Sequence, residues 1–329
     1  MLMRMLHIAK AGFEAARSLS AIPHGHSFSV TAKADLPLAD LRARLGAICA
    51  GLDYCDLNTR FSCPDDLTLI RHLASDLAVP AALSLRSAPG RGVELDAEGQ
   101  ARAWLKTGFE AAHWLPHVPE GHQCGRLHGH GFGVRLLADA GLADYAALEK
   151  AWQPLHALLQ HGTLNRIAGL ENPTSEVLAC WLFDALSARL PAMAAVEVFE
   201  TATAGSRFDD QGLRIWKEQR FEAAVPFDDQ GRYTGHSYLV RLHLAGDIDP
   251  EQGWVRDFGE VKALFTPLYA RLDHHALDQL PGIGATDCAG IARYLATHFA
   301  LPQLVRIDLL ENDTDGALLW LDGGRACTR

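Results

Sequence analysis

Three histidines in the middle of the chain have the spacing of a metal site. His128 and His130 are separated by one residue within "LHGHGF", so in a strand both side chains point to the same face. His113 lies on the strand predicted to precede them in a β-hairpin, so three imidazoles could converge. Three histidines that leave a fourth position open are typical of catalytic zinc sites. The hairpin is therefore a candidate site for Zn²⁺.

A cysteine lies in the predicted turn of the same hairpin. Cys124 precedes His128 by four residues. A thiol near a cation has a lowered pKa and is more often a thiolate at neutral pH. A lone cysteine is usually an unreactive buried residue, and a single His-x-His pair is a weak signal. The combination of the cysteine with three histidines is more specific than either feature alone.

The elements that would position these residues occur three times. Segments that begin at Gly12, Gly108 and Arg220 each contain an aromatic residue followed by Glu-Ala-Ala, a polar turn, Gly-His and alternating apolar residues. This pattern predicts a β-hairpin. Two helical stretches and closing strands follow in each case, so the unit is ββααββ. The predicted repeats are 1–100, 101–209 and 210–329.

The repeats predict an α+β fold with an antiparallel sheet. Four antiparallel strands in one unit cannot cover their own edges. Three units side by side would close a ring of twelve strands with the helices on its outside. We therefore expect a pseudo-trimeric barrel in which the three repeats pack against each other.

The composition excludes several classes of protein. The 329 residues carry a net charge of −10, which argues against a general nucleic-acid-binding surface. The seven cysteines are scattered without a C-x-x-C pair, so neither a disulfide framework nor a four-cysteine zinc site is indicated. No apolar run approaches the length of a membrane span. We expect a cytoplasmic protein with no nucleic-acid or membrane partner.

The middle repeat resembles the 6-pyruvoyltetrahydropterin synthase family, most closely its 6-carboxytetrahydropterin synthase branch. The stretch "FEAAHWLPHVPEGHQCGRLHGHGF" contains the family's F-x-A-x-H and C-x-x-x-H-G-H patterns. The stretches "NPTSE" and "VFET" contain its P-T-S-E and E-T elements. The third repeat resembles the family in "RDFGEV" and "RLDHHALD", and the first repeat is a fainter copy.

The resemblance implies a metal, a thiol and an assembly. His113, His128 and His130 would be zinc ligands, and Cys124 would be the catalytic thiol that moves a proton at the substrate side chain. In the family, three separate subunits form a barrel called the tunnelling fold, or T-fold, and two such rings stack. The chain would therefore form a homodimer of fused pseudo-trimers.

The resemblance also implies residues for proton transfer and for substrate binding. Asp273 and His274 match the family's second acid/base group, in which a carboxylate fixes the imidazole tautomer. Glu200 matches the glutamate that anchors the pterin ring by accepting two of its N–H groups. Thr174 and Glu176 match the P-T-S-E element and would assist, although a plain helix-cap role fits these two equally well.

The departures from the family pattern are complementary. The middle repeat has Gln160–His161 in place of the Asp-His pair, whereas the third repeat keeps Asp273–His274 but has Val225 in place of the first metal histidine. In the first repeat, Arg17 replaces that histidine. We therefore expect one competent site per chain, to which Asp273–His274 would be supplied across the repeat boundary. His161 is the alternative for this role.

The implied reaction is that of a zinc-dependent lyase. Its substrate would be 7,8-dihydroneopterin triphosphate, and its products 6-carboxy-5,6,7,8-tetrahydropterin, acetaldehyde and triphosphate, in the route to queuosine and other deazapurines. One alternative is the pyruvoyl-type product of the same family. The others are a non-catalytic pterin-binding or assembly protein and a zinc hydrolase that acts on a purine nucleotide.

Overall fold

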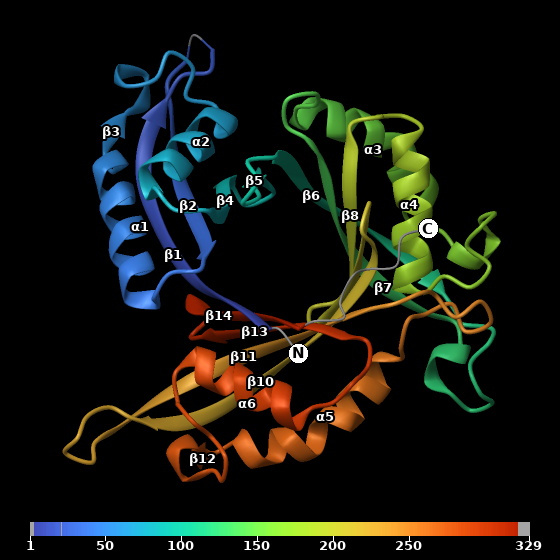
Figure 1. Cartoon of the computed structure of the whole chain (residues 1–329). Coiled ribbons are helices and arrows are strands. Elements are labelled where there is room, and N and C mark those ends of the chain that lie inside the picture. The colour runs from blue at the N-terminus through green and yellow to red at the C-terminus, as the bar shows by residue number, and fades with distance from the viewer. Residues whose placement is uncertain (1–2, 21, 322–329) are drawn as a thin grey trace.

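The computed structural model describes residues 3–20 and 22–321, and its strands form one closed barrel (Figure 1). Of the fourteen strands in the sheet, the twelve that are longer than two residues close through the β10–β11 and β14–β1 pairs, and every neighbouring pair is antiparallel. These strands are β1 Met3–Arg17, β2 His24–Ala34, β4 Ala81–Ala88, β5 Arg91–Leu95, β6 Ala101–His113, β7 His128–Asp139, β8 Met193–Thr201, β9 Ala204–Asp209, β10 Gly212–Pro226, β11 Tyr233–Ala245, β13 Leu304–Glu311 and β14 Asp315–Leu321. The predicted twelve-stranded ring is confirmed.

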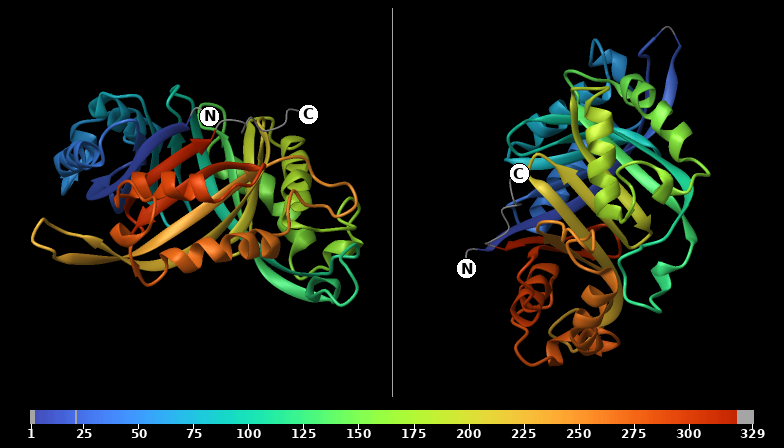
Figure 2. Two further views of the ribbon diagram at one scale, coloured as in Figure 1. Left: turned by 60° about the horizontal axis from the view of Figure 1, so that its bottom comes forward. Right: turned by 90° about the vertical axis from the view of Figure 1, so that its right-hand side faces the viewer.

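Two helices follow each long hairpin and lie on the outside of the barrel (Figures 1 and 2). They are α1 Leu38–Leu52, α2 Asp66–Leu77, α3 Tyr145–Leu159, α4 Ser175–Ser187, α5 Phe258–Leu272 and α6 Cys288–His298. The order ββααββ therefore occurs three times, as expected. In the part of the chain that is described, no helix has the length and apolar character needed to cross a membrane.

Aromatic pairs on the three hairpins anchor the helices. The second strand of each hairpin places an aromatic ring opposite the aromatic residue of the Glu-Ala-Ala motif, and the rings stack with centroids 4.6, 5.1 and 5.1 Å apart. The pairs are Phe13–Phe28, Phe109–Phe132 and Phe221–Tyr238. All six side chains are buried in the cores that the helices cover. Burial of large aromatic surfaces at equivalent places explains why one motif specifies each repeat.

The hairpins extend past the barrel wall at one end. Because neighbouring strands alternate in direction around the ring, β1, β6 and β10 all run the same way, and their hairpins turn at the same end of the barrel. We call this the hairpin end. The wall strands β4, β8 and β13 begin their pairing only at Ser29, Gly133 and Tyr238 of the hairpins. The β10–β11 hairpin projects clearly from the rest of the molecule in Figure 2.

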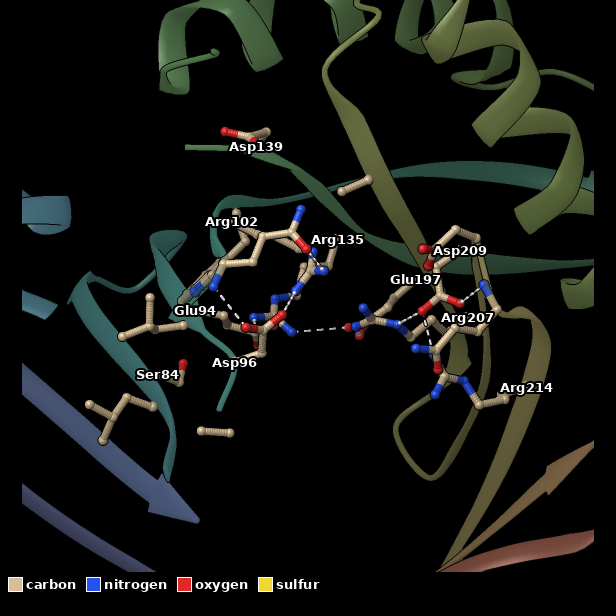
Figure 3. A pocket seen from close by; sticks show the side chains of 18 of the residues that line it. Ser84, Glu94, Asp96, Arg102, Arg135, Asp139, Glu197, Arg207, Asp209 and Arg214 are labelled. Carbon is tan, nitrogen blue, oxygen red and sulfur yellow. Dashed lines mark hydrogen bonds and ion pairs between the residues drawn. The ribbon is translucent and has the colours of Figure 1, made fainter. Parts of the chain in front are cut away.

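The barrel encloses a cavity of about 970 Å³ whose wall is charged (Figure 3). Arg135 forms ion pairs with Glu94 and Glu197, and Arg207 pairs with Glu197 at 2.7 Å and with Asp209 at 2.8 Å. Burial alone would raise the pKa of Glu197, but the two guanidinium groups outweigh it and hold this pKa at about 2. The network links strands of the first and second repeats, so it ties the repeats together from the inside.

The substitution Glu197→Gln is expected to lower the free energy of unfolding by roughly 3 kcal/mol at pH 7, since it leaves two buried cations short of a partner. The pKa of Glu197 is lower in the folded protein than its ordinary value of 4.5, so its stabilising effect is present above pH 4.5 and is lost as the pH falls toward 2. Urea unfolding at pH 7 and pH 3 should show a difference in unfolding free energy between wild type and variant that shrinks at the lower pH.

Glu110→Gln is the matched control for this substitution. Glu110 is 72% exposed, so its loss should change the free energy of unfolding by no more than about 0.5 kcal/mol. An equal effect of both substitutions would contradict this account.

Candidate metal centre

The hairpin of the middle repeat brings the three histidines together. His113 ends β6 and pairs in register with His128 at the start of β7, while His130 follows on the same face. One ligand atom from each ring lies within 4.8 Å of the others. The ring centroids are 4.5, 5.2 and 5.1 Å apart. Among the described residues, no other group of His, Cys, Asp or Glu side chains has this geometry.

The hydrogen bonds of the rings leave nitrogen lone pairs free for a metal. Nδ1 of His113 lies 3.1 Å from the Pro173 carbonyl oxygen, and Nδ1 of His128 lies 2.8 Å from that of Arg126. A carbonyl can only accept, so each Nδ1 carries the proton and each Nε2 is an acceptor. Nε2 of His113 is buried and has no partner, which is unusual for a buried polar atom. Burial lowers the pKa of His113 to about 4, so the ring is neutral at pH 7. These residues fit a zinc ion.

Cys124 lies in the single-turn helix Gln123–Gly125, which connects β6 to β7 and so joins the strands that carry the histidines. Burial raises the pKa of its thiol, and the carboxylates of Glu200 and Asp257 raise it further. The expected lowering of the thiol pKa is therefore not produced by the chain's own groups. A thiolate at this position would need a neighbouring cation or a proton acceptor.

Two carboxylates of the middle repeat lie close to the histidines, Glu200 beside His130 and the buried Glu176 near Glu200. Glu200, near the end of β8, places Oε1 3.7 Å from Nε2 of His130, and burial raises its pKa. Glu176 is 2% exposed, and burial raises its pKa to about 7. Its oxygens accept hydrogen bonds from the Ser175 hydroxyl at 2.9 Å and from the Val255 N–H at 3.3 Å. The two glutamates are close enough for the charge of one to raise the pKa of the other.

Thr174 has a structural role in this structure. Its hydroxyl oxygen accepts the Val177 N–H at 3.1 Å and so caps the N-terminus of α4. The same hydroxyl donates to the Gly253 carbonyl at 2.5 Å. Thr174 therefore joins the middle repeat to the third, which fits the helix-cap interpretation of the P-T-S-E element.

The loop before α5 packs from the third repeat against the start of α4 and the segment that leads into it. Besides Gly253 and Val255, Gln252 contributes its carbonyl to the Asn172 side chain at 2.8 Å. Asp257 caps α5 and is one of the charges that act on Cys124. No role was predicted for Asp257 from the sequence, although it belongs to the stretch "RDFGEV" that resembles the family. The centre therefore lies at the boundary between the second and third repeats.

Asp273 and His274 lie at the far end of α5. Nδ1 of His274 is 2.9 Å from Oδ2 of Asp273, and the other carboxylate oxygen accepts the Glu222 N–H at 2.9 Å. That hydrogen bond, together with those from His274 and Tyr269, lowers the pKa of Asp273. The side chain of His274 is 77% exposed.

Within one chain, Asp273 and His274 lie at the end of α5 that is remote from Cys124. Asp257 caps the start of α5 beside the centre, and Asp273 follows its last residue. Since this helix has fifteen residues, it separates the two positions by about 22 Å. The pair was expected to act across the repeat boundary of the same chain, and in this chain the whole of α5 separates it from the helix end whose charge acts on Cys124. The alternative, His161, is 75% exposed and its ring faces Glu110 at 3.3 Å.

The first repeat has a closed ion-pair network where the middle repeat has its histidines. Arg17 is 2% exposed and donates to Oδ1 of Asp66 at 2.7 Å. The hydroxyls of Ser87 and Tyr145 both donate to Oδ2 of the same carboxylate. Tyr145 belongs to the middle repeat, so this network joins two repeats. Among the described residues, His24 and His26 of the first repeat have no third ligand beside them. In the third repeat Val225 is buried at the equivalent place.

Comparison with known proteins gives matches to both the second and third repeats. The family model described as 6-pyruvoyl tetrahydropterin synthase matches residues 103–211 and again 214–321. A 6-carboxy-5,6,7,8-tetrahydropterin synthase of Synechocystis sp. is 42% identical over 113 residues, which cover 30% of this chain and 86% of that protein. A dihydroneopterin monophosphate aldolase of Pyrococcus furiosus is 29% identical over 97 residues, 28% of this chain and 80% of that protein. A solved structure of 6-pyruvoyl tetrahydropterin synthase from Caenorhabditis elegans is 19% identical, covers 35% of this chain and 94% of its own, and has a TM-score of 0.29.

Proposed function

The chain belongs to the 6-pyruvoyl tetrahydropterin synthase family, and from this premise we propose that it is a zinc-dependent lyase that converts 7,8-dihydroneopterin triphosphate to 6-carboxy-5,6,7,8-tetrahydropterin. The observation that carries the proposal is the three-histidine cluster together with Glu200, which lies 3.7 Å from His130 and whose charge acts on Cys124. The 42% identity to a 6-carboxy-5,6,7,8-tetrahydropterin synthase supports this choice of product. The product would feed queuosine and related deazapurine synthesis.

The proposed reaction balances with one molecule of water. The substrate and water give the carboxylated tetrahydropterin, acetaldehyde and triphosphate. The pterin ring gains two hydrogens as the side-chain carbon that becomes the carboxylate is oxidised, so no external electron donor or acceptor is needed. The bond that breaks joins this carbon to the two-carbon fragment released as acetaldehyde.

The residues of the centre have distinct roles in this proposal. Zinc would supply a Lewis acid that polarises the oxygens of the substrate side chain. Glu200 would hold the ring by accepting two of its N–H groups, a geometry that a carboxylate matches well. Cys124 would accept a proton from the side-chain carbon and return it later. Asp273 and His274 of a second copy of the chain would move a proton on the opposite side, with Asp273 fixing the tautomer of the imidazole.

A substrate panel tests the proposal against its alternatives. Metal-loaded protein should consume 7,8-dihydroneopterin triphosphate, and a chelator should stop the reaction. Dihydroneopterin monophosphate is included because of the similarity to the Pyrococcus furiosus aldolase, and GTP because a zinc hydrolase would act on it. Turnover of GTP alone, or binding of the pterin without turnover, would overturn the proposal.

A further inference from the structure

The inner face of the barrel has an equivalent cross-strand pair in each repeat. It lies three residues after the stacked aromatic residue in the second strand of each hairpin, where strand alternation turns the side chain toward the cavity. In the second and third repeats an arginine lies opposite a carboxylate, whereas in the first repeat both residues carry only a hydroxyl. The pairs are Arg135–Glu197, Arg241–Asp308 and Thr31–Ser84. The first repeat therefore contributes no charge pair at this level of the wall.

Opposite charges close two of the three junctions between repeats on the inside of the barrel (Figure 3). Glu94 of the first repeat forms an ion pair with Arg135 of the second. Asp209 of the second repeat forms an ion pair with Arg214 of the third. In both cases a carboxylate of one repeat neutralises a cation of the next, which is the arrangement that buried charges require.

The junction between the third and first repeats brings cations together instead. Lys33 follows Thr31 on the inner face of β2, and Arg241 and Arg306 line the same cavity from β11 and β13. Burial lowers the pKa of Lys33, the charge of Arg306 lowers it further, and the nearby carboxylates do not offset both effects. No described residue forms an ion pair or hydrogen bond with its ammonium group. Lys33 is therefore an interior cation whose charge is not neutralised.

The two arginines at this junction are held from one side only. Nε of Arg306 lies 2.8 Å from Oδ1 of Asp308, and its Nη2 donates to Oδ2 at 2.9 Å. Nε of Arg241 donates to Glu218 at 2.6 Å, and Nη2 contacts the same carboxylate. In the part of the chain that is described, Nη1 of each guanidinium is left without a partner. Hydrogen-bond donors with positive charge thus remain on both sides of the junction.

We propose that the barrel binds one inorganic oxoanion of the phosphate type between the first and third repeats, held by Lys33, Arg241 and Arg306. The hydroxyls of Thr31 and Ser84 supply further donors, and in Figure 3 Ser84 lies apart from the ion-pair network. Oxygens of such an ion accept charge-assisted hydrogen bonds from guanidinium and ammonium groups. The ion would close this junction as carboxylates close the other two.

The oxoanion site is separate from the metal centre. None of the three clustered histidines, Cys124 or Glu200 lines the cavity. The inference is therefore independent of the proposed function, and its tests use binding and stability in place of turnover.

Calorimetric titration of the metal-loaded protein with inorganic phosphate, at an ionic strength held constant with sodium chloride, tests the site. The wild type should bind one phosphate per chain. Lys33→Met removes the charge but keeps the length of the side chain, and it should weaken binding about 10-fold to 100-fold, because it removes a hydrogen bond to a charged group. Lys150→Met is the matched control, since Lys150 is exposed on α3, and it should bind phosphate as the wild type does. Absence of saturable binding, or equal binding by Lys33→Met, would overturn the proposal.

Thermal unfolding gives a second readout with opposite signs in the two conditions. Without phosphate, Lys33→Met should have a higher Tm than the wild type, because it removes a cation that faces two others. Saturating phosphate should raise the Tm of the wild type by about 2 °C or more and leave that of the variant unchanged. A lysine that only packs against the wall would give the variant a lower Tm in both conditions, and this result would contradict the proposal.

Two controls locate the bound ion. Lys33→Glu places a carboxylate opposite the two arginines, so it should raise the Tm without phosphate and abolish the response to phosphate. Phosphate could instead bind at the metal centre. Binding that persists in Lys33→Met and disappears when a chelator removes the metal would show this and overturn the proposal.

Discussion

Replacement of Cys124 by alanine is expected to reduce kcat by about 10³-fold, within the range that a positioned proton-transfer group contributes. The metal should remain bound at one equivalent per chain, because Cys124 is not one of the three clustered ligands. The hydrogen bond that Cys124 donates to His122 comes from its backbone N–H, so the substitution keeps it. The side chain is a half-buried free thiol, so its removal should change stability little. Steady-state kinetics and metal analysis on the same sample measure both quantities.

A second cysteine provides the control for this experiment. Cys63 is exposed in the first repeat, and its thiol has a long contact of 3.8 Å with Asp65. Cys63→Ala should therefore keep wild-type turnover. If Cys124→Ala also kept it, the thiol would not be the proton-transfer group and the mechanism would be wrong.

Replacement of His113 by alanine is expected to weaken metal binding by more than about 100-fold, because even residues that only support a ligand contribute tenfold to a hundredfold. His113 is fully buried, and its orphaned Nε2 points to the same space as the other two rings. Turnover should fall with the metal content. Titration with zinc and a competing chelator gives the affinity.

The control for His113 is a histidine outside the cluster. His156 lies on α3 and contacts Trp152, with ring centroids 6.1 Å apart. His156→Ala should bind zinc as the wild type does. Undiminished zinc affinity in His113→Ala, in a protein that is still folded, would show that the three histidines are not the metal site.

The repeats made the fold predictable from the sequence. The aromatic-Glu-Ala-Ala motif predicts a hairpin three times, and in the structure its aromatic residues Phe13, Phe109 and Phe221 occupy equivalent buried positions. The spacing of His128 and His130 places both on one face of β7, opposite His113 on β6. These inferences succeed because strand alternation and hairpin pairing are local rules.

The position of the Asp-His pair was not predictable in the same way. The sequence shows that Asp273 and His274 follow a helical stretch, but not which end of that helix lies beside the centre. Asp257, at the other end of α5, is one of the two carboxylates that raise the pKa of Cys124. The distance that separates them is a property of packing between repeats, which no local pattern reports.

The charged interior of the barrel was also missed. Glu94, Arg135 and Glu197 alternate with apolar residues along their strands, a pattern that is equally typical of a solvent-exposed face. Only ring closure turns that face inward and makes the charges partners across three strands. The charged interior could therefore be recognised only from the closed sheet of the structure.

The mass of the pterin product tests the central claim most directly. Zinc-loaded protein is incubated with 7,8-dihydroneopterin triphosphate, and the products are separated and identified by mass spectrometry. The account predicts 6-carboxy-5,6,7,8-tetrahydropterin together with an equal amount of acetaldehyde. A 6-pyruvoyl product that keeps all three side-chain carbons would contradict it, as would unchanged substrate from fully metallated protein.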